Sequence, residues 1–436
     1  MRRICFLALV STLLGIAAEV PDPHAPAPAV STVDDPAVAL LQFRAALARA
    51  PAITAARARV AGAEQAQGAA GVLPDPMVGG DIGRERTRMG EEMTMYGAMI
   101  EQTLPRWGER DAMRQTARAQ VSREAANVAA VIGDHAAAVA TGIAEWMAAR
   151  DTLVFVRQSR ERIAALREVV HVRIAAGGGM IGDQLALDTK AQQLDLQIAD
   201  LERRQADALV MVRGRLGLRS DTPVPPFAAL DPATIRVEAN PMAQTAAAMQ
   251  LEAEAMEREA VARGNPETAV GLSWEREAAG TDSQTDKLAL SFRMSLPIYR
   301  SAYSGAADSA RSRSRAARHE ASGATWMARS QVSRAQRAIA QAQQAQRTAD
   351  DIAARTRTEY DAVIQQVGSG GASVTLSLTL LDMITESGMN AVMARLDSQM
   401  ALAELWRLAP PDLQTAVVAD DSDHSAVHHQ PPTTTP

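Results

Sequence analysis

The segment Lys287–Leu296, with the sequence KLALSFRMSL, alternates large apolar residues with small or polar ones. Leu288, Leu290 and Phe292 occupy every second position, and this period of two is typical of a β-strand with one apolar face. A strand of about ten residues is long enough to cross a bilayer at a tilt. The same pattern also suits a soluble sheet that buries one face, so the strand alone leaves both environments open.

A hairpin partner precedes this strand. Val270, Leu272 and Trp274 alternate with small or polar residues in the same way, and the polar segment 278–283 is typical of a connecting turn. We therefore expect a β-hairpin at about 267–297.

Both strands have counterparts 192 positions earlier in the chain. Pro74 corresponds to Pro266, and the offset then stays constant without a net insertion to the end of the repeat. The other matched positions of the first copy are Val78, Arg84-Glu85, Leu104-Pro105, Gly178-Gly179 and Arg215-Leu216. An ungapped register of this length indicates a duplicated unit. We expect a first repeat at 33–220, with its hairpin at about 76–105, and a second repeat at 221–412.

Each repeat opens with helices that begin at a proline. Asp35-Pro36 and Pro51 predict two helix starts in the first repeat, because proline is well tolerated in the first helical turn. Asp231-Pro232 and Asn240-Pro241 are expected in matching roles in the second repeat.

A long helical hairpin follows each pair of strands. The segment 112–175 contains no proline and no turn cluster, and as a helix it would extend roughly 90 to 100 Å. A glycine-rich turn and a returning helix complete a hairpin at about 112–216, and the second repeat predicts the same at about 305–408. Apolar residues spaced three and four apart in the first returning helix indicate coiled-coil-like packing. These residues are Leu185, Leu187, Leu194, Leu196, Ile198 and Leu201. The predicted fold is mostly α with a small β part.

The two ends of the chain have separate roles. Residues 1–18 combine a basic start, a short apolar stretch and small residues, as in a secretory signal peptide. Residues 19–32 form a proline-rich linker, and residues 413–436 are expected to be a disordered tail. The single cysteine, Cys5, would leave with the signal peptide, so we expect no disulfide.

Composition and motifs argue against two function classes. The formal net charge is −6 and the basic residues are scattered among acids, so no nucleic-acid partner is expected. The sequence contains no G-x-S-x-G, no phosphate-binding glycine loop and no H-E-x-x-H. We expect no enzymatic activity, no cofactor and no bound metal. The histidines His424, His428 and His429 lie in the predicted tail, which lacks the preorganised geometry of a tight metal site.

The signal peptide, the duplicated unit and the Leu-Pro that ends the second strand of each copy together resemble the TolC-like outer-membrane efflux family. The resemblance covers about residues 33–410. The segments LPDP at 73–76 and IEQTLPRWG at 100–108 resemble the cation-efflux (CzcC/CusC-like) branch of that family.

The resemblance implies a homotrimer in the outer membrane of a Gram-negative bacterium. Each protomer would give four strands to a shared 12-stranded transmembrane β-barrel, and the long helices would form a trimeric α-barrel in the periplasm. The family's members are passive exit ducts of tripartite efflux systems, here for metal cations or small toxic compounds delivered by an inner-membrane pump and a periplasmic adaptor (membrane fusion protein). Four strands cannot close a barrel within outer-membrane lipid, so strands must be shared between chains. The alternative is a soluble periplasmic coiled-coil adaptor or scaffold protein.

By their position, the glycine-rich turns match the family's periplasmic tips, which contact the adaptor. The glycines concerned are Gly177, Gly178, Gly179, Gly368, Gly370 and Gly371. They are also the residues that a tight turn requires, and both roles stay open. Nearby acids could form charged rings at a narrow entrance, or could simply be solvated helix surface. These acids are Asp183, Asp188, Asp382 and Glu386.

Two aromatic residues follow the strands. Trp107 and Tyr299 are 192 positions apart and come directly after the Leu-Pro region of each hairpin, where aromatic side chains would anchor the protein at the membrane interface. Methionines on the opposite face from Tyr96 and Ile100 would point into the barrel lumen, either as soft metal ligands or as flexible filler. They are Met77, Met93, Met95 and Met99, with Met89 in the turn.

Overall fold

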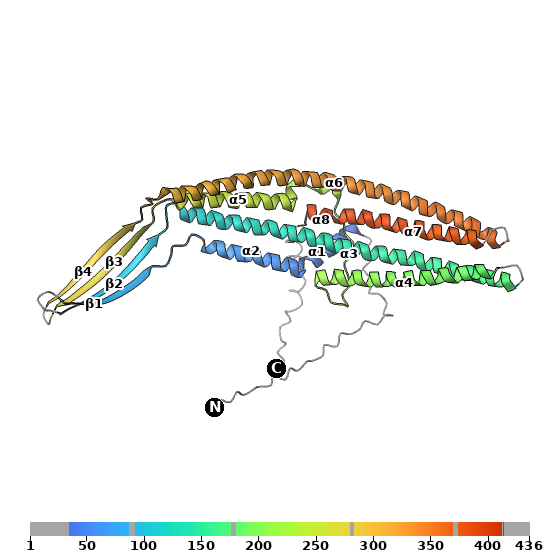
Figure 1. Cartoon of the computed structure of the whole chain (residues 1–436), viewed down its shortest axis with the longest axis horizontal. Helices are drawn as coiled ribbons and strands as arrows, with labels where there is room; N and C mark the ends of the chain where they lie inside the picture. Colours follow the sequence, from blue (N-terminus) through green and yellow to red (C-terminus); the bar gives the residue numbers. More distant parts are fainter. Residues whose placement is uncertain are drawn as a thin grey trace, which may run out of the picture.

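The computed structural model describes residues 35–86, 92–175, 180–279, 283–368, 374–411 and 413. Its helices lie side by side along one axis, and a small sheet projects from one end of them (Figure 1). The predicted signal peptide, the linker and nearly all of the tail lie outside the described residues, as do the tip glycines 177–179, 370 and 371.

Within its described residues, the first repeat contributes four helices. They are α1 (Pro36–Ala48), α2 (Pro51–Ala69), α3 (Glu109–Ala175) and α4 (Ile181–Leu216). The Asp35 carboxylate caps α1 by accepting a hydrogen bond from the backbone N–H of Ala37 at 2.9 Å. Gly217 ends α4 in the left-handed conformation, with φ of 65°, which glycine adopts without steric cost.

The second repeat begins differently. Its helical elements are η1 (Pro232–Thr234), η2 (Val237–Ala239), α5 (Pro241–Ala262), α6 (Arg300–Gly368), α7 (Val374–Ala403) and α8 (Leu405–Leu408). The prediction that Asp231-Pro232 would match Asp35-Pro36 is wrong, because only a three-residue 3-10 turn follows it. Asp231 does cap that turn through the Ala233 N–H, but a cap cannot sustain a helix without a buried face behind it.

The sheet contains four strands in chain order, and each is antiparallel to its neighbours. The strands are β1 (Met77–Arg86), β2 (Glu92–Leu104), β3 (Thr268–Ala279) and β4 (Ser283–Met294). The central pairing of β2 with β3 joins the two repeats, and it places Ile100 opposite Leu272. β1 and β4 are the edges of this sheet.

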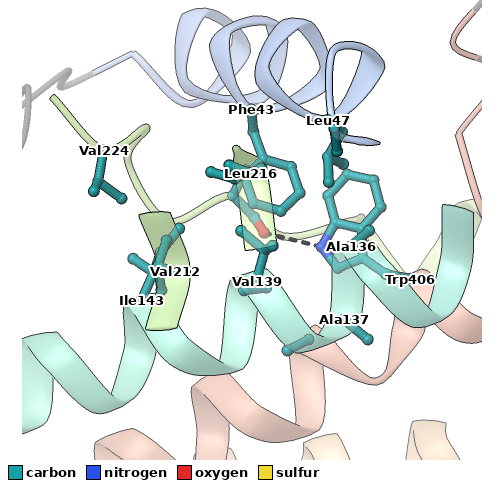
Figure 2. Packing of buried hydrophobic residues seen from close by; sticks show 14 of the residues in the cluster. Phe43, Leu47, Ala136, Ala137, Val139, Ile143, Val212, Leu216, Val224 and Trp406 are labelled. Atoms are coloured by element: carbon teal, nitrogen blue, oxygen red, sulfur yellow. Dashed lines mark hydrogen bonds between the residues drawn. The ribbon is translucent and has the colours of Figure 1, made fainter. Parts of the chain in front are cut away.

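The main core lies where the helices of both repeats meet, midway along the molecule (Figures 1 and 2). Trp406 of α8 is completely buried, and its ring centroid lies 5.1 Å from that of Phe43 in α1. Its indole N–H donates to the carbonyl oxygen of Ala228 at 3.1 Å, so the buried polar atom is satisfied. This side chain joins the end of the second repeat to the start of the first.

A second core extends toward the tips. Leu187 and Leu194 of α4 pack there against α3 and α7, as the heptad-like spacing predicts. Leu185 and Leu196 do not, since they are 67% and 74% exposed. The two pairs lie on opposite faces of α4, and only one face meets the neighbouring helices of the protomer.

One of the described helices is long and apolar enough by composition to cross a membrane. α3 contains an 18-residue window of mean hydropathy 1.2, of which 39% is buried inside the protein. Its apolar residues, such as Val139 and Ile143, are core residues of the helical body.

Candidate functional site: membrane sheet, junction and helical tips

The pairing registers place the aliphatic and aromatic residues of the four strands on one face of the sheet. These even-numbered residues are Val78, Ile82, Tyr96, Ala98, Ile100, Val270, Leu272, Trp274, Leu288, Leu290 and Phe292. Ile82, Leu290 and Phe292 are 77%, 78% and 67% exposed in the protomer. A continuous apolar face of this kind is not stable against water and marks contact with lipid or protein.

The odd-numbered face carries polar, small and methionine side chains. Arg293 of β4 pairs with Glu101 of β2, with 2.9 Å between Nη2 and Oε2. The predicted methionines Met77, Met93, Met95 and Met99 occur on this face, as their register positions require. No helix packs across either face of the described strands, which project beyond the helical body (Figure 1). A sheet that is apolar on one side, polar on the other and uncovered on both favours the membrane over a soluble core.

Charged residues limit the apolar band at the end of the sheet far from the helices. Arg276 and Asp286 form a two-point pair, with Nε–Oδ1 at 2.7 Å and Nη2–Oδ2 at 2.9 Å. The Arg276 guanidinium also lies over the Trp274 ring, 5.2 Å from its centroid. Arg84, at the corresponding position of the first repeat, is exposed on the same face.

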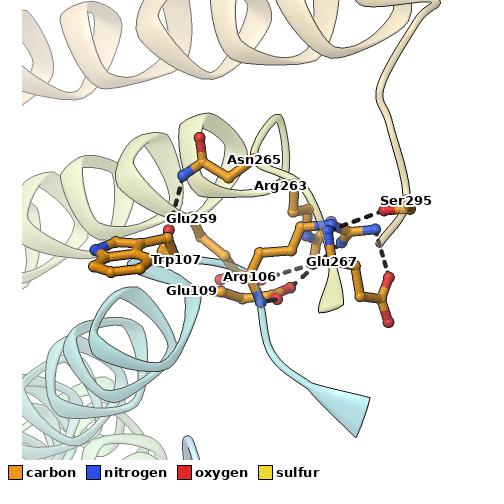
Figure 3. A network of polar contacts seen from close by, with 8 residues as sticks. All are labelled: Arg106, Trp107, Glu109, Glu259, Arg263, Asn265, Glu267 and Ser295. Atoms are coloured by element: carbon orange, nitrogen blue, oxygen red, sulfur yellow. Dashed lines mark hydrogen bonds and ion pairs between the residues drawn. The ribbon is translucent and has the colours of Figure 1, made fainter. Parts of the chain in front are cut away.

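A polar network joins sheet to helices at the other end (Figure 3). Arg106 lies between the repeats: its Nη2 contacts Glu267 Oε2 at 3.0 Å, and its backbone N–H donates to Glu109 Oε2 at 2.9 Å. Glu267 and Ser295 exchange two hydrogen bonds, from the Glu267 N–H to Ser295 Oγ at 2.9 Å and from the Ser295 N–H to the Glu267 carbonyl at 2.8 Å. The network fixes how the strands leave the helices. Nothing in the sequence pattern distinguished Arg106 and Glu267, which are 161 residues apart.

The two predicted interface aromatics lie at this junction and point outward. Trp107 and Tyr299 are 89% and 83% exposed. Asn265 holds the backbone of Trp107 in place through a 2.8 Å hydrogen bond to its carbonyl oxygen (Figure 3). The next residue, Gly108, has φ of +81°, a conformation that a larger residue would adopt only with strain.

The four tip acids divide into two pairs. Asp188 forms an ion pair with Arg167 at 3.0 Å, and Asp382 forms one with Lys190 at 2.5 Å. Asp183 lies in the first turn of α4, where an acid also interacts favourably with the helix dipole. Glu386 is exposed on α7. Among the predicted tip glycines, the described part of the chain includes only Gly368, the last residue of α6.

Among the described residues, no three histidine, cysteine, aspartate or glutamate side chains gather in a way that could hold a metal ion. His135 is occupied instead in a contact between its Nε2 and the carbonyl oxygen of Arg215, at 2.9 Å.

Comparison with known proteins agrees with this architecture. Residues 43–218 match the family model described as outer membrane efflux protein. Over these residues the chain is similar to the outer membrane efflux proteins. None of the curated proteins matches its sequence.

Solved structures show the same fold at low sequence identity. CusC has a TM-score of 0.74 at 13% identity, over 86% of this chain and 92% of that one. VceC from Vibrio cholerae has a TM-score of 0.71 at 15% identity, over 86% and 96%. The CmeC outer membrane channel of Campylobacter jejuni has a TM-score of 0.72 at 10% identity, over 88% and 89%. The narrow range of scores does not favour one branch of the outer membrane efflux proteins.

Proposed function

We propose that three copies of this chain form one passive exit duct of a tripartite efflux system in the outer membrane. Each copy gives four strands to a 12-stranded transmembrane barrel, and the helices of the three copies line a periplasmic tunnel. An inner-membrane pump and a periplasmic adaptor deliver the cargo to the duct.

The uncovered four-stranded sheet is the observation that carries this proposal. Its apolar face suits lipid and its polar face suits a water-filled lumen. Its edges, β1 and β4, leave backbone groups without partners inside the protomer, and lipid offers none. Further copies of the chain supply those partners. Trp107 and Tyr299 then act as anchors at the inner rim of the membrane.

We infer that the helical tips form the adaptor contact and the entrance. The predicted contact residues are the glycines at 177–179, 368, 370 and 371. Asp183 and Glu386, together with the ion-paired Asp188 and Asp382, bring negative charge to this end. Such a ring favours passage of cations.

For the cargo, we propose metal cations or small toxic compounds, as in the cation-efflux (CzcC/CusC-like) branch. Cells that lack this chain should become sensitive either to metal salts or to organic dyes and detergents. Growth assays with both sets of compounds distinguish the two cargo classes, and unchanged sensitivity to all of them contradicts a role in efflux.

Fractionation of cells tests the duct itself. We expect the full chain in the outer-membrane fraction, extracted only by detergent, with the native mass of a trimer. Recovery from the soluble periplasm without detergent contradicts the proposal and favours the periplasmic adaptor or scaffold.

A further inference from the structure

The two hairpins have the same internal register when the 192-residue offset is applied. Met77 pairs with Glu101 in the first hairpin. Ala269 pairs with Arg293 in the second, and each of these residues lies 192 positions after its counterpart. The repeat therefore extends from the sequence to the pairing of individual residues.

The strand pairing that connects the two repeats occurs once in the protomer. There, β2 pairs with β3, and Ala98 lies opposite Trp274. The equivalent pairing would join β4, the second strand of the second repeat, to β1, the first strand of the first repeat. Within the protomer these two strands are the open edges of the sheet.

We propose that β4 of one protomer pairs with β1 of the next in the register that joins β2 to β3. This inference rests on the proposed trimer and specifies its strand contacts. Shifting the Ala98–Trp274 pair by 192 positions places Leu290 opposite Ile82 of the partner subunit. The Met99–Ser273 pair likewise places Ser291 opposite Asp81 of the partner subunit.

The apolar face supports this register. The proposed register pairs even positions with even positions, so Leu290 and Phe292 lie beside Ile82 and Gly80 of the partner subunit. The lipid-facing band then continues across the interface. A slip by one residue would turn one strand's apolar side chains into the lumen.

Charge at the far end of the sheet supports it independently. The register places Asp286 opposite Arg86 of the partner subunit and diagonal to Arg84 of the partner subunit, while Arg276 already pairs with Asp286 from the other side. The acid then lies between basic residues of two protomers, and opposite charges in such cross-strand positions are stabilising.

The geometry of a closed barrel gives a third argument. Following the pairing from strand to strand leads from Ile82 to Tyr96 and then to Arg276. The repeat equivalent of Ile82 is Trp274, two residues before Arg276. Each pair of strands therefore shifts the register by two residues. Six hairpins in this register shift it by twelve residues around twelve strands. With about 3.3 Å per residue and about 4.8 Å between strands, the strands tilt by roughly 35°. This tilt lies within the range typical of transmembrane barrels.

Disulfide trapping in outer membranes tests the register. The full chain carries Cys5→Ser, so that only engineered cysteines react. One variant combines Leu290→Cys with Ile82→Cys, and a second combines Ser291→Cys with Asp81→Cys, because alternate positions of an antiparallel ladder differ in spacing. The matched controls are Ala98→Cys with Trp274→Cys and Met99→Cys with Ser273→Cys, the equivalent pairs inside one protomer.

The intraprotomer controls show which of the two ladder positions forms a disulfide under mild oxidation. At that position, we expect the interprotomer pair to give covalent trimers. Pairing Leu290→Cys with a cysteine at Gly80 or Arg84 should reduce the cross-linked fraction at least roughly fivefold, because diagonal neighbours lie about 7–8 Å apart. In a protein whose native mass is still that of a trimer, two results overturn the register. One is stronger cross-linking of a shifted pair, and the other is no cross-linking of any interprotomer pair while the controls react. A monomeric native mass overturns the proposed duct instead.

Discussion

At the scale of single residues, Trp406 shows how one side chain joins the repeats. We expect Trp406→Ala to cost about 3–5 kcal/mol, because it opens a cavity and leaves the Ala228 carbonyl without its donor. A lower thermal unfolding temperature in detergent measures the loss. Trp326 is 68% exposed, so Trp326→Ala is the control and should stay within about 0.5 kcal/mol.

His135 gives the helical body a sensitivity to acid. Burial lowers the pKa of His135 below its usual range; the hydrogen bond to the Arg215 carbonyl opposes this shift, and the Arg215 charge adds to it. The unfolded chain therefore binds the proton more readily, and the imidazole destabilises the fold as the pH falls below about 6.5. His135→Gln should narrow the difference in unfolding temperature between pH 7.5 and pH 5.5. An unchanged difference contradicts this, and His319→Gln controls for the loss of an exposed imidazole.

At the scale of elements, close helix contacts depend on glycine. A Cβ at Gly133 in α3 would lie 2.8 Å from the backbone oxygen of Trp406, whereas a Cβ at Gly62 in α2 meets nothing within 4 Å. We expect Gly133→Ala to destabilise by about 1–3 kcal/mol through overpacking. Gly62→Ala should stabilise by up to about 1 kcal/mol, since alanine is the better helix former. Chemical denaturation compares them, and equal effects contradict the contact.

The sheet gives a test of its two faces. Leu290→Arg places a charge on the apolar face and should cost about 2–4 kcal/mol if that position lies near the middle of the bilayer. The adjacent Ala289→Arg projects onto the polar face and should leave the amount of assembled trimer nearly unchanged. Heat-modifiability on gels measures assembly, and equal losses from both variants contradict the assignment of the faces.

At the scale of the whole molecule, the charge of the tips is expected to act on ions at the entrance. Asp183→Asn combined with Glu386→Gln should lower the preference for cations over anions in planar-bilayer recordings. These two acids are the informative ones, because Asp188 and Asp382 are already paired with Arg167 and Lys190. Asp221→Asn, an exposed acid beyond the far end of α4, is the control. Unchanged selectivity in the double variant contradicts a charged entrance.

Periodicity predicted the fold well wherever the cause was local. The alternation at 287–296 placed its apolar residues on the correct face, because side chains along a strand must alternate. The helix-start signal failed at Asp231-Pro232, where the cap is present but no partner surface supports a long helix. Periodicity also could not separate Leu187 from Leu185, because which face of α4 is covered depends on helices distant in the chain.

Spacing along the chain was enough to reveal the duplicated unit, the extents of the strands and of the long helices, and the family resemblance. The pairing of β2 with β3, the Arg106–Glu267 contact and the burial of Trp406 become evident only in three dimensions. Each of these joins residues more than 150 positions apart, and such contacts form only when separate elements have packed together.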